Sequence, residues 1–235
     1  MDGEEQKLPI TITYRFEFSN TVMKDFSVHL DPDSLALLNA VPEKPPAWTH
    51  LDFNQCTNCP LKEEAHCPVA LRLSLLVKDF AKEVSHKEVL VRVYTEHRIY
   101  EQLTTVQRGL SSIMGIIMAT SGCPILDKLR PNTAFHLPFA SSMETAYRMI
   151  GMYLVAQVMR EKEGLKPDWT MQGLLDLYHN ISTVNRYMSR RLQAATEKDA
   201  STNAIVILHS FSEEVQAYVE ERLREMRPLF ETLIK

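Results

Sequence analysis

The residues most able to do chemistry in this chain are four cysteines: Cys56, Cys59, Cys67 and Cys123. The first three lie within twelve residues in the pattern C-x2-C-x7-C, and three of the four are followed directly by proline. Four thiolates are the ligand count of a tetrahedral zinc site or an iron–sulfur cluster. Proline stiffens the loop, and Cys-Pro is similar to the pair that closes bacterial ferredoxin motifs. The spacing therefore predicts a four-cysteine metal centre, with a [4Fe–4S] cluster slightly favoured over zinc.

The same cysteines have a second interpretation without a metal. Free cysteine is among the most buried residue types and packs as a small hydrophobic side chain. Three cysteines in so short a loop argue against plain packing, because loops lie at the surface. His50 or His66 could also replace one cysteine as a zinc ligand. The spacing leaves these alternatives open.

A second polar group consists of His136, Glu144 and Arg148. Glu144 and Arg148 are one helical turn apart in a largely apolar segment, so we expect them to be buried and paired. As a functional site, the group would be an enzyme pocket with His136 as proton donor and Arg148 as anion holder. As a structural feature, it would be a buried ion pair that fixes the segment after Cys123. The structural role is the more common one for such pairs.

Hydrophobic periodicity predicts the elements that must position these residues. Residues 10–18 and 26–30 alternate in hydrophobicity and form a hairpin around a turn at Ser19-Asn20-Thr21, and residues 88–94 alternate in the same way. The chain then either continues as a strand through Tyr100 or folds back there. Apolar residues at three- and four-residue steps predict helices over 69–84, 104–120, 141–164, 169–195 and 199–235.

These elements predict an α+β fold, in which a small antiparallel sheet of three or four strands packs with a bundle of about five helices. We expect one intertwined domain over 1–235, with the sheet, the cysteine loop and the first long helix in 1–103 and the helical bundle in 104–235. Ser141 or Ser142 can cap the helix over 141–164. That helix is apolar nearly all round, which predicts a buried central helix.

Composition excludes several classes of function. The net charge of −4 gives no overall positive field for nucleic acid. No run of about 18 apolar residues exists to span a membrane. The N-terminus is acidic and lacks the apolar core of a secretory signal, so we expect a cytoplasmic protein. Three functions remain: a structural or redox-sensing metal centre, an enzyme with the His136 pocket, and a metal-free module for an unidentified protein partner.

Three short segments resemble an uncharacterised bacterial family, a domain of unknown function. They are QCTNCPL from Gln55, SGCPIL from Ser121 and FHLPFA from Phe135. The resemblance extends over residues 8–235 and implies a bacterial cytoplasmic protein in which these segments belong together. No activity is established for that family, so no catalytic residue is carried over.

Overall fold

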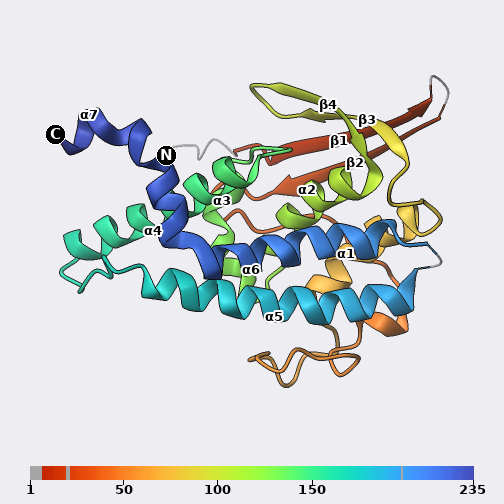
Figure 1. The fold of residues 1–235 in the computed structure, drawn as a ribbon. Coiled ribbons are helices and arrows are strands. Elements are labelled where there is room, and N and C mark those ends of the chain that lie inside the picture. The colour runs from red at the N-terminus through yellow and green to blue at the C-terminus, as the bar shows by residue number, and fades with distance from the viewer. Residues whose placement is uncertain (1–6, 20–21, 197) are drawn as a thin grey trace, which may run out of the picture.

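The computed structural model describes residues 7–19, 22–196 and 198–235, so the predicted turn at Asn20-Thr21 lies outside the described residues (Figure 1). The elements in chain order are β1 (Ile10–Ser19), β2 (Val22–Leu30), η1 (Ala47–Thr49), α1 (Pro68–Phe80), β3 (Glu88–Tyr94), β4 (Ile99–Thr105), α2 (Val106–Ala119), η2 (Leu126–Leu129), α3 (Pro131–Ala134), α4 (Ser142–Lys162), α5 (Gln172–Ala195), α6 (Ala200–Met226), η3 (Arg227–Phe230) and α7 (Glu231–Ile234).

The predicted α+β class is confirmed. The described residues form one four-stranded antiparallel sheet and seven α-helices. The helix count exceeds the expected five because α3 and α7 are additional helices of four residues each. The chain folds back after Tyr94, so that β3 and β4 pair as a hairpin.

The sheet has the strand order β2-β1-β3-β4 and one buried side. Tyr14 and Phe16 of β1 and Val91 of β3 are fully buried on that side. The opposite side carries charged pairs such as Arg15 with Asp25, whose Nη2 and Oδ2 atoms are 2.7 Å apart. Buried and exposed side chains thus alternate along β1 and β3 as the sequence predicts, and the buried side of the sheet is the one that faces the helices.

α2 packs against the buried side of the sheet. Leu110, Ile113 and Ile117 of this helix are buried. Gly109 lies where the helix approaches the strands most closely, because a Cβ atom there would lie 2.6 Å from Phe16 and 3.0 Å from Val91. α2 can therefore lie this close to the sheet only because the residue at position 109 has no side chain.

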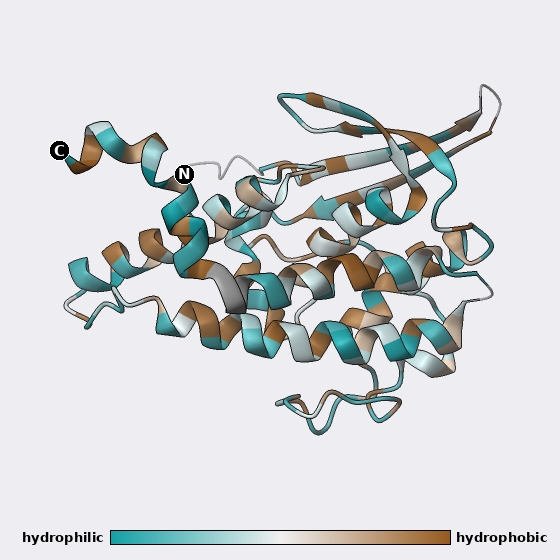
Figure 2. Cartoon of the chain, viewed as in Figure 1, coloured by the Kyte–Doolittle hydropathy of each residue, from teal (hydrophilic) through white to brown (hydrophobic). Residues whose placement is uncertain are grey.

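α5 and α6 form a further helical layer, which packs on α1 and α2. Figure 1 shows the sheet at the top, α1 and α2 beneath it, and α5 and α6 side by side in front. Figure 2 shows hydrophobic and hydrophilic residues alternating around α5 and α6, as expected for helices with one buried side. Buried residues from the sheet and the helices form one hydrophobic cluster.

The prediction of a buried central helix over 141–164 is wrong. α4 lies at the end of the molecule that carries the C-terminus (Figure 1). It buries Ala146, Met149 and Ile150 but leaves Tyr147 and Val155 more than half exposed. Its apolar residues therefore exceed what its packing against α3 and α6 covers.

No helix in the described ranges has the length and hydrophobicity needed to cross a membrane.

Candidate functional site

The cysteine segment connects η1 to α1 and packs into the protein. Cys67 is the N-cap residue of α1, and its N–H group donates to the Thr49 carbonyl at 2.8 Å. Cys123 follows Gly122, a glycine with φ of 91° after the end of α2. Cys67 and Cys123 belong to the hydrophobic core, and Cys56 and Cys59 pack against it. Two of the four thiols are therefore core side chains, and the other two are partly buried.

The predicted four-cysteine metal centre is wrong. Within residues 7–19, 22–196 and 198–235, no three His, Cys, Asp or Glu side chains are placed to hold a metal ion together. Burial, followed by the neighbouring Cys67, Cys59 and Cys123, raises the pKa of the Cys56 thiol to about 12. Burial also raises the pKa of Cys123. The four cysteines predicted as [4Fe–4S] or zinc ligands instead pack in the hydrophobic core or against it.

Arg191 of α5 holds the start of the cysteine segment, and sequence reasoning missed it. Its guanidinium donates to the carbonyls of Trp48, His50 and Leu51 at 2.7–2.8 Å. The residue is only 1% exposed. Asn58 adds a second attachment through hydrogen bonds to Asn180 of the same helix. A buried arginine bonded to carbonyls has a structural role, because it satisfies backbone groups that the irregular segment leaves unpaired.

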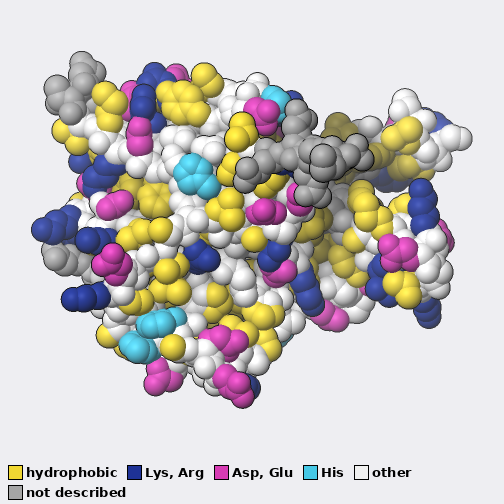
Figure 3. All heavy atoms as spheres, turned by 180° about the vertical axis from the view of Figure 1, so that it is seen from behind, with side chains coloured by type: hydrophobic (Ala, Val, Ile, Leu, Met, Phe, Trp, Pro, Cys, Tyr) yellow, Lys and Arg dark blue, Asp and Glu magenta, His cyan; other side chains and the backbone are white. Residues whose placement is uncertain are grey.

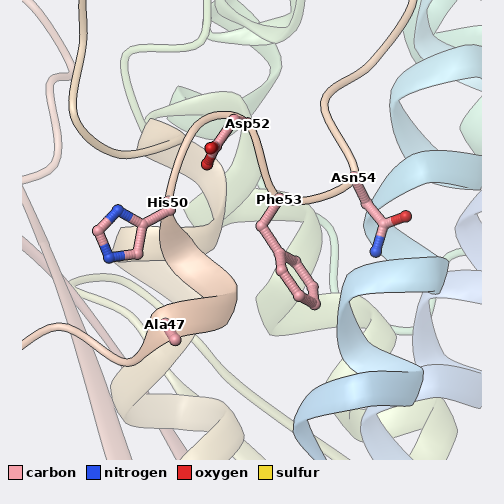
Figure 4. Close-up of a pocket in the computed structure, with 5 residues that line it drawn as sticks. All are labelled: Ala47, His50, Asp52, Phe53 and Asn54. Carbon is pink, nitrogen blue, oxygen red and sulfur yellow. The ribbon is translucent and has the colours of Figure 1, made fainter.

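A hollow of about 560 Å³ lies at the start of this segment, lined by Ala47, His50, Asp52, Phe53 and Asn54. Figure 4 shows the His50 ring and the Asn54 amide on opposite sides of the Phe53 ring. Binding sites bring a few polar groups to one point. These side chains diverge, so the hollow is a weak candidate site.

A larger cavity of about 760 Å³ lies between α2, α5 and α6 and is closed at one end by the segment 126–149. We call it the α2–α6 cavity. Polar and apolar side chains line it together. Those used below are Ser112, His136, Phe139, Arg148, Met149, Tyr178, Ile181 and Asn185. Two of the three predicted pocket residues, His136 and Arg148, are among them.

Glu144 is not part of this group, so the expected Glu144–Arg148 ion pair is wrong. The carboxylate accepts from the Ser141 N–H group at 2.8 Å and from the Ser141 hydroxyl at 2.9 Å. The Ser141 oxygen accepts in turn from the Glu144 N–H group, so the two residues form a capping box at the start of α4. These bonds lower the pKa of Glu144. Glu144 is exposed and faces the helix end, because the cap fixes its direction.

Arg148 brings a positive charge to the cavity wall. Its Nη2 group donates to the Asn132 carbonyl at 2.9 Å, while its Nε group is buried and has no hydrogen-bond partner among the described residues. In that part of the chain no carboxylate lies within 4.0 Å of its guanidinium. Burial lowers the pKa of Arg148, but a guanidinium still keeps its charge at neutral pH.

His136 lies at the end of a chain of hydrogen bonds that joins the sheet to the cavity. The hydroxyl of Tyr14 lies 2.5 Å from His136 Nε2 and 2.7 Å from Ser112 Oγ. Burial, followed by the charge of Arg148, lowers the pKa of His136 to about 3. Burial raises the pKa of Tyr14. At neutral pH both groups are therefore uncharged, and the imidazole tautomer sets which of them donates.

The unusual pKa of His136 predicts a pH-dependent stability. Below pH 6.5 the unfolded chain takes up a proton at this histidine, whereas the folded chain does not until about pH 3. The stability from the neutral ring is therefore complete above pH 6.5 and is lost as the pH falls toward 3. We expect urea unfolding to show a loss about 1–2 kcal/mol larger between pH 7 and pH 5 than in His136→Gln.

The exposed His97 provides the control for this measurement, because its side chain is 78% exposed. His97→Gln should keep the wild-type pH slope. Equal slopes in wild type and His136→Gln would show that the imidazole is not held neutral.

The segment around Phe139 is held in an uncommon backbone conformation. Phe139 has φ of 59°, in the left-handed region that costs non-glycine residues roughly 1–3 kcal/mol. Phe139 lines the α2–α6 cavity, and the same segment carries His136. Such strain persists where the surroundings determine the conformation, which occurs most often at ligand sites.

Sequence reasoning missed Tyr14, Ser112 and Tyr178 as members of this site. Tyr14 lies in the alternating segment 10–18 and Ser112 in the predicted helix over 104–120, and neither pattern indicates a site. Tyr14 is 98 residues from Ser112 and 122 from His136, so no local spacing connects them. The FHLPFA segment was the available signal, because it contains both His136 and Phe139.

Comparisons with known proteins agree with the resemblance of the short segments. No curated protein and no solved structure matches the chain. A family model, described as a domain of unknown function (DUF6901), matches residues 12–231. The match includes the cysteine segment, the α2–α6 cavity and all of α6. The chain therefore belongs to this family, the domain of unknown function DUF6901.

Proposed function

We propose that the α2–α6 cavity binds a small organic anion with an apolar body, and that Arg148 holds its charged group. The observation that carries this proposal is a guanidinium in the cavity wall with a buried Nε group and no carboxylate partner among the described residues. A partly buried charge is costly unless an opposite charge or hydrogen bonds compensate it. A carboxylate ligand supplies both, because it accepts two parallel bonds from a guanidinium.

The rest of the cavity wall suits a ligand with a hydrophobic part. Met149 and Ile181 are buried apolar residues of the lining, and the Tyr178 ring is 3% exposed. Asn185 and Ser112 add a few polar groups. Sites for small molecules measure about 300–1,000 Å³ and combine a mainly apolar wall with few polar groups. A volume of about 760 Å³ lies within this range.

We favour binding over acid–base catalysis. A general base works best when its pKa lies near the working pH. The pKa of about 3 makes His136 a weak base at neutral pH, so its role is to orient a ligand through a neutral ring. The enzyme alternative, with His136 as proton donor, would require a charged imidazole that the neighbouring Arg148 disfavours.

The proposed setting is the cytoplasm. All four cysteines are free thiols, the state that a reducing compartment maintains. The net charge of −4 disfavours nucleic acid as a partner. The proposed ligand is thus a small metabolite of that compartment, and binding would stabilise the folded chain by an amount that grows with the logarithm of ligand concentration.

Calorimetric titration with two carboxylates, octanoate and 3-phenylpropanoate, tests the proposal. We expect at least one to bind more tightly than the neutral amide of the same shape. Arg148→Met should weaken that binding by about 10–100-fold, because it removes a charge-assisted contact worth about 1.5–3 kcal/mol. The dissociation constant is the measured quantity.

Arg186 provides the control, because it is exposed on α5 and does not line the cavity. Arg186→Met should bind the carboxylate like the wild type. Equal affinity for acids and amides, or unchanged affinity in Arg148→Met, would show that Arg148 does not hold an anion.

A further inference from the structure

The C-terminal half of α4 has a hydrophobic side that no described part of the chain covers. Val155, Val158 and Met159 are 54%, 42% and 58% exposed. The one residue of this half that is buried is Gln157. The loop after α4 supports the opposite side of this half, where Tyr153 donates to the Asp168 carboxylate and Gln157 accepts from the Asp168 N–H group, both at 2.8 Å.

The C-terminal elements extend this hydrophobic side. The Tyr147 and Phe230 rings lie 6.2 Å apart, which brings η3 beside α4. Tyr147, Leu229, Leu233 and Ile234 are exposed by 55–81%. Figure 3 shows this end of the molecule on the right, with hydrophobic side chains among charged ones. We call the combined surface the α4 face; it consists of Tyr147, Val155, Val158, Met159, Leu229, Leu233 and Ile234.

We propose that the α4 face binds the α4 face of a second copy of this chain, with the two α4 helices antiparallel about a two-fold axis. The proposal goes beyond ligand binding and does not depend on it. Exposed apolar residues in such number at one end of a molecule are typical of interfaces. A two-fold interface must be complementary to itself, and three features of α4 meet that condition.

The charges at the two ends of the helix are complementary in the antiparallel arrangement. Glu144 and Lys162 lie on the same side of α4 as Val155, because they are separated from it by 11 and 7 residues. When two copies cross near the middle of α4, Glu144 of each lies opposite Lys162 of the other. A parallel arrangement would place like charges together.

Gly151 lies near the centre of α4, close to that crossing point. Nothing lies within 4 Å of the position that its Cβ atom would take. Glycine is the least favourable helix residue except proline, and no described neighbour requires one here. A second helix could cross closely at this point, because glycine has no side chain to keep the two backbones apart.

The α4 face also has the residue types that an interface needs. A standard interface buries about 800 Å² on each partner, with an apolar centre and a polar rim. The seven apolar side chains, exposed by 42–81%, supply such a centre. Glu144, Arg160 and Lys162 supply charged groups at its edge.

Sedimentation of the full chain from about 1 to about 100 µM tests the proposal, because a standard interface associates in this range. We expect a dimer, and Val155→Glu should raise its dissociation constant by at least about 10-fold. Val41→Glu is the matched control, since Val41 is 40% exposed outside the α4 face. Gly151→Ala should weaken the dimer yet raise the Tm of the dilute monomer.

Charge exchange tests the antiparallel arrangement. Lys162→Glu should weaken the dimer by about 10-fold, because the two-fold axis repeats each pair. Adding Glu144→Lys to the same chain should restore part of the lost affinity, because it re-forms the charge pairs but also removes the carboxylate of the capping box. A wild-type chain that stays monomeric at about 100 µM overturns the proposal in favour of a different protein partner. A dimer unaffected by Val155→Glu, or a double exchange that restores nothing, also overturns it.

Discussion

Replacing Arg191 by leucine is expected to lower the free energy of unfolding by about 3–5 kcal/mol, because it leaves buried carbonyl groups without donors. The wild-type guanidinium satisfies the carbonyls of Trp48, His50 and Leu51 from a position that is 1% exposed. Leucine fills part of the space but donates no hydrogen bond. Urea unfolding followed by circular dichroism measures the loss.

The same variant should loosen the cysteine segment before the whole protein unfolds. Amide hydrogen exchange in residues 47–67 should become faster than in α5 itself. Lysine at position 191 should rescue only part of the loss, because an ammonium group cannot reproduce the guanidinium fork.

The neighbouring Arg190 is the matched control, since it is exposed and its guanidinium lies 4.8 Å from the centre of the Tyr187 ring. Arg190→Leu should change the free energy of unfolding by less than about 1 kcal/mol. Equal losses at positions 190 and 191 would show that the three carbonyl contacts contribute little.

Replacing Gly109 by alanine is expected to cost about 1–3 kcal/mol through steric overlap, even though alanine favours a helix. The new Cβ atom would lie 2.6 Å from a Phe16 ring carbon and 3.0 Å from a Val91 methyl group. Both neighbours are fully buried in the sheet, and the Phe16 ring also packs edge-on against Phe80 at 4.8 Å. The ring therefore has little room to move, and α2 must shift away from the sheet. The midpoint of urea unfolding reports the change.

Gly115 of the same helix provides the control. Its Cβ atom would meet only Leu208, at an ordinary contact distance of 3.9 Å. Gly115→Ala should be neutral or stabilising, by up to about 1 kcal/mol. Adding Phe16→Leu should cost less in the Gly109→Ala background than in the wild type, because the smaller side chain relieves the overlap. Strictly additive losses would place the strain elsewhere.

The secondary structure was predictable because its signals are local. Val89, Val91 and Val93 alternate with polar residues, and all three are buried in β3. Ser141 was predicted as a cap and forms a capping box with Glu144. Alternation and capping depend on residues within one or two turns of each other, so the sequence contains the whole signal.

The candidate site was only partly predictable. His136 and Arg148 were named, and both line the α2–α6 cavity. Glu144 was assigned to the same site because it is one turn from Arg148, yet its bonds to Ser141 turn it toward the helix end. Spacing shows which side chains can meet, but competing local bonds decide which of them do.

The sequence by itself determined the α+β class and the order of the main elements, because these follow from hydrophobic period and caps. The predicted helix over 199–235 was too long, since α6 ends at Met226 and η3 and α7 follow it. Only the tertiary structure decided the state of the cysteines, the partners of Arg191 and the exposure of α4. Trp48 and Arg191 are 143 residues apart, and no periodicity encodes such a contact. The thiol pKa likewise depends on how much protein surrounds Cys56. Burial is a property of the assembled layers, and it places two of the four cysteines in the core and two against it, while it leaves part of one apolar helix uncovered.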